Sequence, residues 1–143
     1  MSETVAIASD HAGVELKEAL KGELKLLGLT PLDLGTTGPT SVDYPDFANA
    51  LAEALKNGKA ARGVLICGSG IGISIAANRH KHIRAALCHN EEVAVLSRQH
   101  NDANVLALGA RVVSDAQAKK ILRAFFTTDF EGGRHARRVE KMS

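Results

Sequence analysis

Hydrophobic and polar positions in this chain alternate between two periods. Short, mostly apolar runs bounded by turn residues predict strands at residues 4–9, 30–35, 63–67, 83–88 and 104–109. Between them, apolar residues recur at helical spacing, as at Leu16, Leu20, Leu24 and Leu27 in a predicted helix over 14–27 that Gly28 ends. Further helices are predicted from Pro45, over 73–80, from the cap Asn90 to Arg98, and after the cap Ser114.

Five strands that alternate with helices over short connections predict an α/β fold. We expect residues 1–143 to form a single domain, a three-layer α/β/α sandwich around a five-stranded parallel sheet. The sheet would be doubly wound and Rossmann-like, with strand order 2-1-3-4-5. Ligands bind such sheets at the carboxyl ends of the strands. This rule selects residues 9–11, 67–72 and 89–90 as candidate site positions.

Composition narrows the classes of function. The 143 residues are 45% hydrophobic, 24% charged and 3% aromatic, with a formal net charge of +2 and no Trp. This balance argues against disorder, and it offers nucleic acid neither a basic surface nor stacking platforms. No apolar run reaches the ~20 residues of a membrane helix, and the N-terminal residues lack a secretion signal. Two cysteines make a disulfide framework improbable and favour a reducing cytoplasm.

The strongest local signal is the loop Cys67-Gly68-Ser69-Gly70-Ile71-Gly72, which lies between a predicted strand and a predicted helix. Three glycines in five positions expose backbone N–H groups, and the helix dipole adds positive potential at the same place. An anion or a developing oxyanion is the natural ligand of such a loop. A thiolate at Cys67 would be stabilised there. The alternative is a buried, inert thiol above a tight turn.

Familiar phosphate motifs do not fit this loop. A dinucleotide fingerprint needs a third glycine where Ile73 stands, and a P-loop needs a Gly-Lys-Ser/Thr sequence that is absent. A cysteine phosphatase loop would need an arginine six residues after the cysteine, and that residue is again Ile73. A covalent phosphocysteine mechanism therefore lacks the arginine that would bind the phosphate.

Three other polar groups are candidates, each with a plainer alternative. Asp10-His11 follows the first strand, where Asp10 could simply cap a helix. Residues 98–102 form a polar run that is expected between a helix and the fifth strand. The imidazole of His100 in this run could move protons, and a solvated loop is the alternative. Arg134 and Arg138 lie four apart on one face of a short helix and could grip a phosphate, or belong to a solvated basic tail.

A metal site is not indicated. The residues that suggest one are His80, His82, Cys88 and His89, and they have no evident carboxylate partner. Core or surface roles suit them better.

The motifs together resemble the family of ribose-5-phosphate isomerase B and the galactose-6-phosphate isomerase subunits. The resemblance spans nearly the whole chain and rests on five ordered motifs: SDHAG (9–13), DYP (43–45), ICGSGIGISIAANR (66–79), SRQHNDANVLALGAR (97–111) and EGGRHARRV (131–139).

This resemblance implies an aldose–ketose isomerase acting on a phosphosugar through a cis-enediolate, without metal or cofactor. Cys67 would be the base that moves a proton between C2 and C1. The N–H groups of Gly68, Ser69, Gly70, Ile71 and Gly72 would stabilise the enediolate oxygen. Ser69 stands where many family members have Thr, and its hydroxyl could bind substrate or tune Cys67.

The resemblance assigns the rest of the site as well. His100 would assist ring opening and Asp10 would bind the ring-opening oxygens. The phosphate would be held by His11, Arg134 and Arg138, with Arg111 as a further contributor. Pocket-lining positions of the family match Tyr44, Asn101 and His135. Family members are dimers or tetramers with the pocket at a subunit interface, so a homo-oligomer is expected.

Alternatives remain open at this stage. The substrate could be a six-carbon phosphosugar such as allose 6-phosphate or galactose 6-phosphate, because pocket depth is not readable from sequence. A non-catalytic phosphosugar sensor is a weaker hypothesis, since a sensor would need neither Cys67 nor His100.

Overall fold

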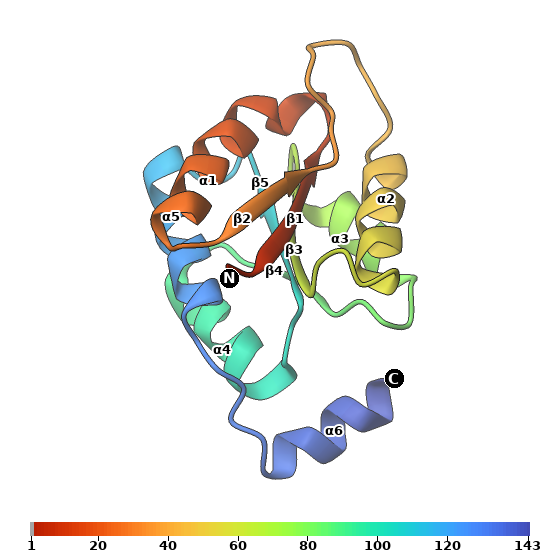
Figure 1. The fold of residues 1–143 in the computed structure, drawn as a ribbon, viewed down its shortest axis with the longest axis vertical. Coiled ribbons are helices and arrows are strands. Elements are labelled where there is room, and N and C mark those ends of the chain that lie inside the picture. The colour runs from red at the N-terminus through yellow and green to blue at the C-terminus, as the bar shows by residue number, and fades with distance from the viewer. Residues whose placement is uncertain (1) are drawn as a thin grey trace.

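A computed structural model describes residues 2–143 and has a five-stranded, all-parallel sheet at its centre (Figure 1). The strands are β1 (Thr4–Ser9), β2 (Thr30–Asp33), β3 (Arg62–Cys67), β4 (Ala85–Leu87) and β5 (Val105–Gly109). Their order is β2-β1-β3-β5-β4. The predicted α/β class and parallel sheet are confirmed, but the predicted order 2-1-3-4-5 is wrong at its last two places.

The exchange of β4 and β5 has a physical reason. All five residues of β5 are buried, and the strand pairs with β3 on one side and β4 on the other. In contrast, β4 has three half-buried residues and follows the charged Arg84. A continuous apolar run suits the interior of a sheet, and a short, partly exposed strand suits its edge.

Helices cover both faces of the sheet, which gives the expected three layers (Figure 1). The helices α1 (Val14–Leu26), α4 (Glu91–Asn101) and α5 (Asp115–Phe126) pack together on one face. The other face is covered by α2 (Tyr44–Lys56) and α3 (Ile71–Asn78). The last helix, α6 (Arg134–Met142), lies apart from both layers and packs near the end of α4.

Each face of the sheet has its own apolar core. On the α1–α4–α5 side, Leu20 and Phe125 pack against Ile7 and Leu106. On the α2–α3 side, Leu51 and Ile73 pack against Leu65. Alternate residues of each central strand thus point into opposite cores, as expected for a sheet buried on both faces.

Two element boundaries differ from the sequence prediction. The helix expected from residue 73 begins at Ile71, directly after the glycine loop. The helix expected to end at Arg98 continues to Asn101, so His100 is helical rather than part of a loop. It ends where Asp102 adopts a left-handed conformation and its N–H donates to the Arg98 carbonyl.

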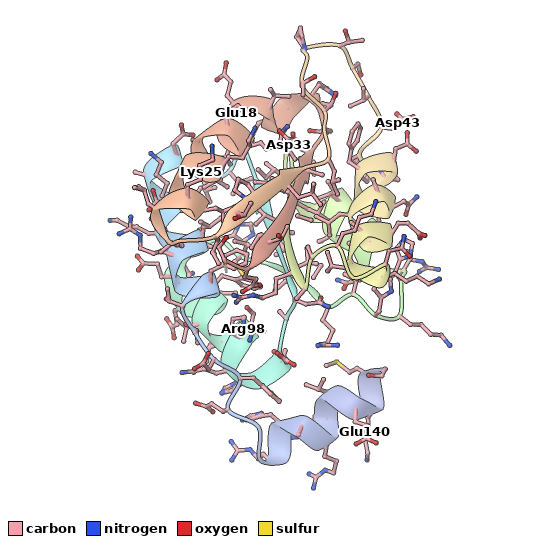
Figure 2. All side chains as sticks on the ribbon, in the orientation of Figure 1. Glu18, Lys25, Asp33, Asp43, Arg98 and Glu140 are labelled. Carbon is pink, nitrogen blue, oxygen red and sulfur yellow. The ribbon has the colours of Figure 1, made fainter. Side chains whose placement is uncertain are left out.

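A buried ion pair joins α1 to the end of β2. Asp33 is labelled in Figure 2. The fully buried Lys17 Nζ donates to Asp33 Oδ1 at 2.6 Å, and Lys21 Nζ donates to Oδ2 at 2.9 Å. The N–H of Gly35 also donates to Oδ1. Burial raises the pKa of Asp33, but the hydrogen bonds from Lys17, Gly35 and Lys21 outweigh it and hold the pKa below its usual value.

We expect Asp33→Asn to destabilise the fold by about 3–5 kcal/mol at neutral pH, because it leaves the Lys17 ammonium buried without a counter-charge. A carboxylate whose pKa is lowered on folding stabilises above its unfolded pKa of about 3.9 and loses that effect as pH falls below it. Urea titrations from pH 7 to pH 3 should therefore show a smaller acid loss for Asp33→Asn than for wild type. Asp129→Asn, at an exposed carboxylate, should shift stability by no more than about 0.5 kcal/mol. Equal stability of Asp33→Asn and wild type would contradict the assignment.

Candidate functional site

The thiol of Cys67 lies at the carboxyl end of β3, immediately before the glycine loop and α3. Its side chain is 4% exposed, and the Gly70 N–H donates to Sγ at 3.2 Å. The structure thus brings the thiol under the loop, where a backbone donor points at the sulfur.

The path of the loop depends on a glycine at position 70. Gly70 has φ +79°, and a Cβ there would come within 2.6 Å of Leu87 and 2.8–2.9 Å of the β5 backbone. Only glycine meets both constraints. The chain can therefore turn sharply off β3 and start α3 close to the sulfur.

Backbone donors of the loop divide into two groups. The Gly70 N–H faces Cys67, and the Ile71 N–H donates to Ser69 Oγ at 3.1 Å. Within residues 2–143, the N–H groups of Gly68, Ser69 and Gly72 have no hydrogen-bond partner. Those three donors are the ones that remain for an oxyanion.

Tyr44 contacts the end of the loop at Gly72, and Arg111 contacts its start at Gly68. A Cβ at Gly72 would come within 2.4–2.7 Å of the Tyr44 ring, so the first turn of α3 lies directly against that phenol. A Cβ at Gly68 would lie 3.0 Å from Arg111 Nη1. The guanidinium of Arg111 therefore adds a positive charge beside the loop, at a position suited to an anionic group.

Asp10 and His11 lie at the neighbouring strand end. Asp10 is 6% exposed and accepts from the Ala12 N–H at 3.0 Å, so it caps the short 3-10 helix η1 (His11–Gly13). His11 Nδ1 accepts from the Val42 N–H at 3.2 Å, which ties the 36–43 segment over it. A hollow of about 330 Å³ lies between His11 and residues 37–39.

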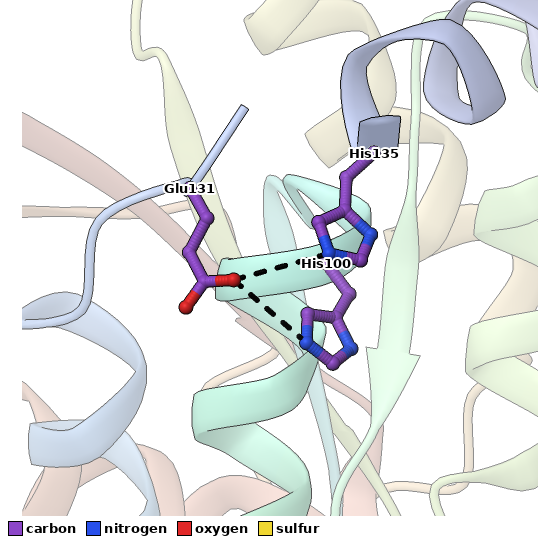
Figure 3. A group of neighbouring side chains, drawn as sticks. All are labelled: His100, Glu131 and His135. Atoms are coloured by element: carbon purple, nitrogen blue, oxygen red, sulfur yellow. Dashed lines mark ion pairs between the residues drawn. The ribbon is translucent and has the colours of Figure 1, made fainter. Parts of the chain in front are cut away.

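The remaining predicted site residues form a second cluster. His100 and Asn101 end α4, and Arg134, His135 and Arg138 belong to α6. The rings of His100 and His135 stack with centroids 4.3 Å apart, and both face the carboxylate of Glu131 (Figure 3). Partial burial and the neighbouring His100 and Arg134 lower the pKa of His135. Glu131 was not among the predicted site residues, although its place in the 131–139 motif could have indicated it.

These two clusters lie at opposite ends of the sheet. Helices of a parallel α/β fold run back along the strands, so the end of α4 lies where the strands begin. Arg84 and Asn104, at the starts of β4 and β5, bond to each other, and Arg84 Nε also donates to the Asn101 carbonyl. From Gly63, which pairs with Val105, to Cys67, β3 alone spans roughly 13 Å at about 3.3 Å per residue. One chain therefore does not bring Cys67 and His100 together.

Three of the residues considered earlier for a metal, His80, His82 and Cys88, have structural contacts, and His89 is exposed. His80 bonds to the Asn49 side chain at 2.8 Å and His82 to the Ala52 carbonyl at 2.7 Å. Cys88 is buried, and burial raises the pKa of its thiol to about 11 despite a hydrogen bond with Ser97. Neither cysteine forms a disulfide.

Comparison with known proteins shows which family the chain resembles in sequence. A model of the family described as Ribose/Galactose Isomerase matches residues 5–142. The chain belongs to this family. Ribose-5-phosphate isomerase B of Escherichia coli is 45% identical over 139 residues, which cover 97% of this chain and 93% of that one.

Solved structures of the ribose/galactose isomerase family have the same fold as this chain. Ribose-5-phosphate isomerase B of Clostridium thermocellum superposes with a TM-score of 0.95 at 51% identity, over 97% of this chain and 94% of the other. The Mycoplasma genitalium enzyme with bound ribulose-5-phosphate gives 0.94 at 44% identity, over 99% and 95%. The chain is accordingly a sugar-phosphate isomerase. Within residues 2–143, no helix has the length and apolar character needed to cross a membrane.

Proposed function

We propose that this chain interconverts ribose 5-phosphate and ribulose 5-phosphate through a cis-enediolate. The observation that carries the proposal is the juxtaposition of a buried thiol with three unpartnered backbone N–H groups, those of Gly68, Ser69 and Gly72. Proton transfer next to a carbonyl needs these two devices together, a base and a preformed oxyanion site. The substrate is inferred from relatives named for this reaction, including one with ribulose-5-phosphate bound.

In the proposed mechanism, the Cys67 thiolate removes the proton from C2 of the open-chain aldose. The electron pair moves into the C1–C2 bond, and the carbonyl oxygen at C1 becomes an oxyanion. Free N–H groups of the loop then donate to that oxygen. The hydroxyl proton at O2 passes to the oxyanion at O1, the thiol returns its proton to C1, and C2 becomes the carbonyl carbon of the ketose. The backbone donors supply the polarisation that a metal ion would otherwise provide.

Ring opening and phosphate binding require residues from both clusters. His100 would take and return the proton of the ring-opening hydroxyl, with Asp10 holding the ring oxygens. His11 and Arg111 would face the phosphate from the loop side, and Arg134 and Arg138 from α6. Because the clusters lie at opposite ends of one chain, we propose that a second copy supplies the α4–α6 cluster. A two-fold interface would complete two sites at once.

Exposed apolar side chains beside the loop support this assembly. Ile71 and Ile75, one turn apart on α3, are 53% and 58% exposed. Apolar side chains that adjoin a polar site are typical of an interface between copies. The proposal is a homodimer, or a homotetramer built from such dimers, acting in the reducing cytoplasm where Cys67 stays free.

Proton NMR in D₂O tests the reaction directly. Purified chain with ribose 5-phosphate should give ribulose 5-phosphate signals, together with loss of the C2 proton signal as solvent deuterium enters. Conversion of allose 6-phosphate or galactose 6-phosphate, with none of ribose 5-phosphate, would assign a six-carbon substrate instead. No conversion and no exchange with any of the three would overturn the proposal.

We expect Arg138→Ala to raise KM for the phosphosugar by about tenfold or more while kcat falls less, because a charge-assisted bond to phosphate is worth about 1.5–3 kcal/mol in binding. The matched control is Arg137→Ala, which removes an exposed arginine that projects about 100° away around the same helix. In steady-state kinetics, KM and kcat of Arg137→Ala should stay near the wild-type values. An unchanged KM in Arg138→Ala would assign that side chain to solvent.

A further inference from the structure

Three side chains with metal-binding atoms converge where α4 meets the start of α6. His100 Nε2, Glu131 Oε1 and His135 Nε2 all lie within 4.8 Å of one another. The carboxylate oxygen is 3.9 Å from His100 Nε2 and 3.8 Å from His135 Nε2. Figure 3 shows both ring nitrogens directed at the same carboxylate oxygen.

The donor set is that of a zinc site with an open position. Two imidazoles and one carboxylate, with water in the fourth place, is an established ligand combination for Zn²⁺. At Zn–N and Zn–O distances of about 2.0–2.2 Å, tetrahedral ligands lie roughly 3.4 Å apart, so the two Glu131–histidine separations of 3.9 and 3.8 Å need to close by only about half an ångström. Glu131 is about half exposed and can make that adjustment by rotating its side chain.

The backbone holds the three ligands in register. The Glu131 N–H donates to the Gln99 carbonyl at 3.1 Å, next to His100, and the His135 N–H donates to the Gly132 carbonyl at 3.1 Å. The stacked rings of His100 and His135 lie 12° from parallel, so the His100 side chain, which is 41% exposed, rotates on binding to bring both Nε2 lone pairs onto one ion. Arg134 and Arg138 oppose a cation here, but both are exposed and screened by solvent.

We propose that His100, Glu131 and His135 bind Zn²⁺, and that the bound ion reversibly inhibits the isomerase. The inhibitory part rests on the proposed function, because it requires His100 to carry a proton during ring opening. Zn²⁺ occupies the Nε2 lone pair that would accept this proton. The ion is an inhibitor and takes no part in the reaction.

Direct binding is measured first, on the full chain. Titration with Co²⁺ should give visible d–d absorption of a four-coordinate ion, and calorimetry with Zn²⁺ should give one site per chain. Glu131→Gln should weaken binding at least tenfold. Glu140→Gln, at an exposed carboxylate of α6, should bind as wild type. Equal affinity in wild type and Glu131→Gln, or a thiolate-to-cobalt charge-transfer band, would overturn the site.

Activity is measured next. Zn²⁺ should inhibit wild type and EDTA should restore it, while Glu131→Gln, compared with its own metal-free rate, should need at least tenfold more Zn²⁺ for the same fractional inhibition. Equal inhibition of both proteins would overturn the inhibitory role. Glu131-dependent binding in a chain with no isomerase activity would instead leave the metal site in place and remove the proposed function.

Discussion

Replacing Cys67 with alanine should lower kcat by at least about 10²–10⁴-fold, the usual contribution of a positioned general base. The substitution removes the group that we propose accepts the C2 proton. The neighbouring backbone donors stay in place, because the loop path depends on Gly70 and its contacts with β5 rather than on the thiol. Phosphosugar binding should therefore survive, which calorimetry with ribose 5-phosphate would measure.

Solvent exchange separates loss of the base from a general loss of activity. Cys67→Ala should fail to wash deuterium into C2 even during long incubation. The matched control is Cys88→Ala, which removes the other buried cysteine on the far side of the sheet, and it should retain turnover within about twofold of wild type. Near-normal exchange in Cys67→Ala would remove the thiol from the mechanism.

Periodicity in the sequence predicted most of the fold. Period-two and continuous apolar runs located all five strands, and β1 matches its prediction residue for residue. The spatial order of β4 and β5 was not predictable in this way, because both runs are apolar and either strand could lie next to β3. What distinguishes them is burial: β5 is covered on both faces, whereas β4 is partly exposed.

Local patterns also predicted half of the candidate site. The strand–glycine–helix sequence correctly placed Cys67 at the end of β3, and the rule of carboxyl strand ends brought Asp10 next to it. The contacts of Tyr44 with Gly72 and of Arg111 with Gly68 join segments far apart in sequence. No periodicity reports such contacts, and here only the resemblance to a family had suggested these residues.

The separation of the two clusters could not be predicted from residue types. His100 was expected in a loop before the fifth strand, which leaves its end of the sheet undefined. Once α4 continues to Asn101, His100 is fixed at the opposite end from Cys67. If Cys67 and His100 act on one substrate molecule, they must therefore come from two copies of the chain.

Two inactive variants should restore activity when they share an oligomer. Cys67→Ala and His100→Ala are each expected to lose at least about 10²-fold in turnover, since each removes a proton-transfer group. If each site takes Cys67 from one copy and His100 from the other, a mixed dimer contains one intact site and one doubly defective site. Mixed dimers isolated through two different affinity tags should then show about half of wild-type activity.

A second mixed dimer gives the opposite expectation and serves as the control. Wild type paired with the double variant Cys67→Ala/His100→Ala has one defect in each shared site, so this dimer should be nearly inactive. If both residues instead served the same site within one chain, the wild-type half would keep about half of the activity and the first pairing would have none. Turnover of the two tagged preparations, measured side by side, therefore decides between a shared site and a site within one chain.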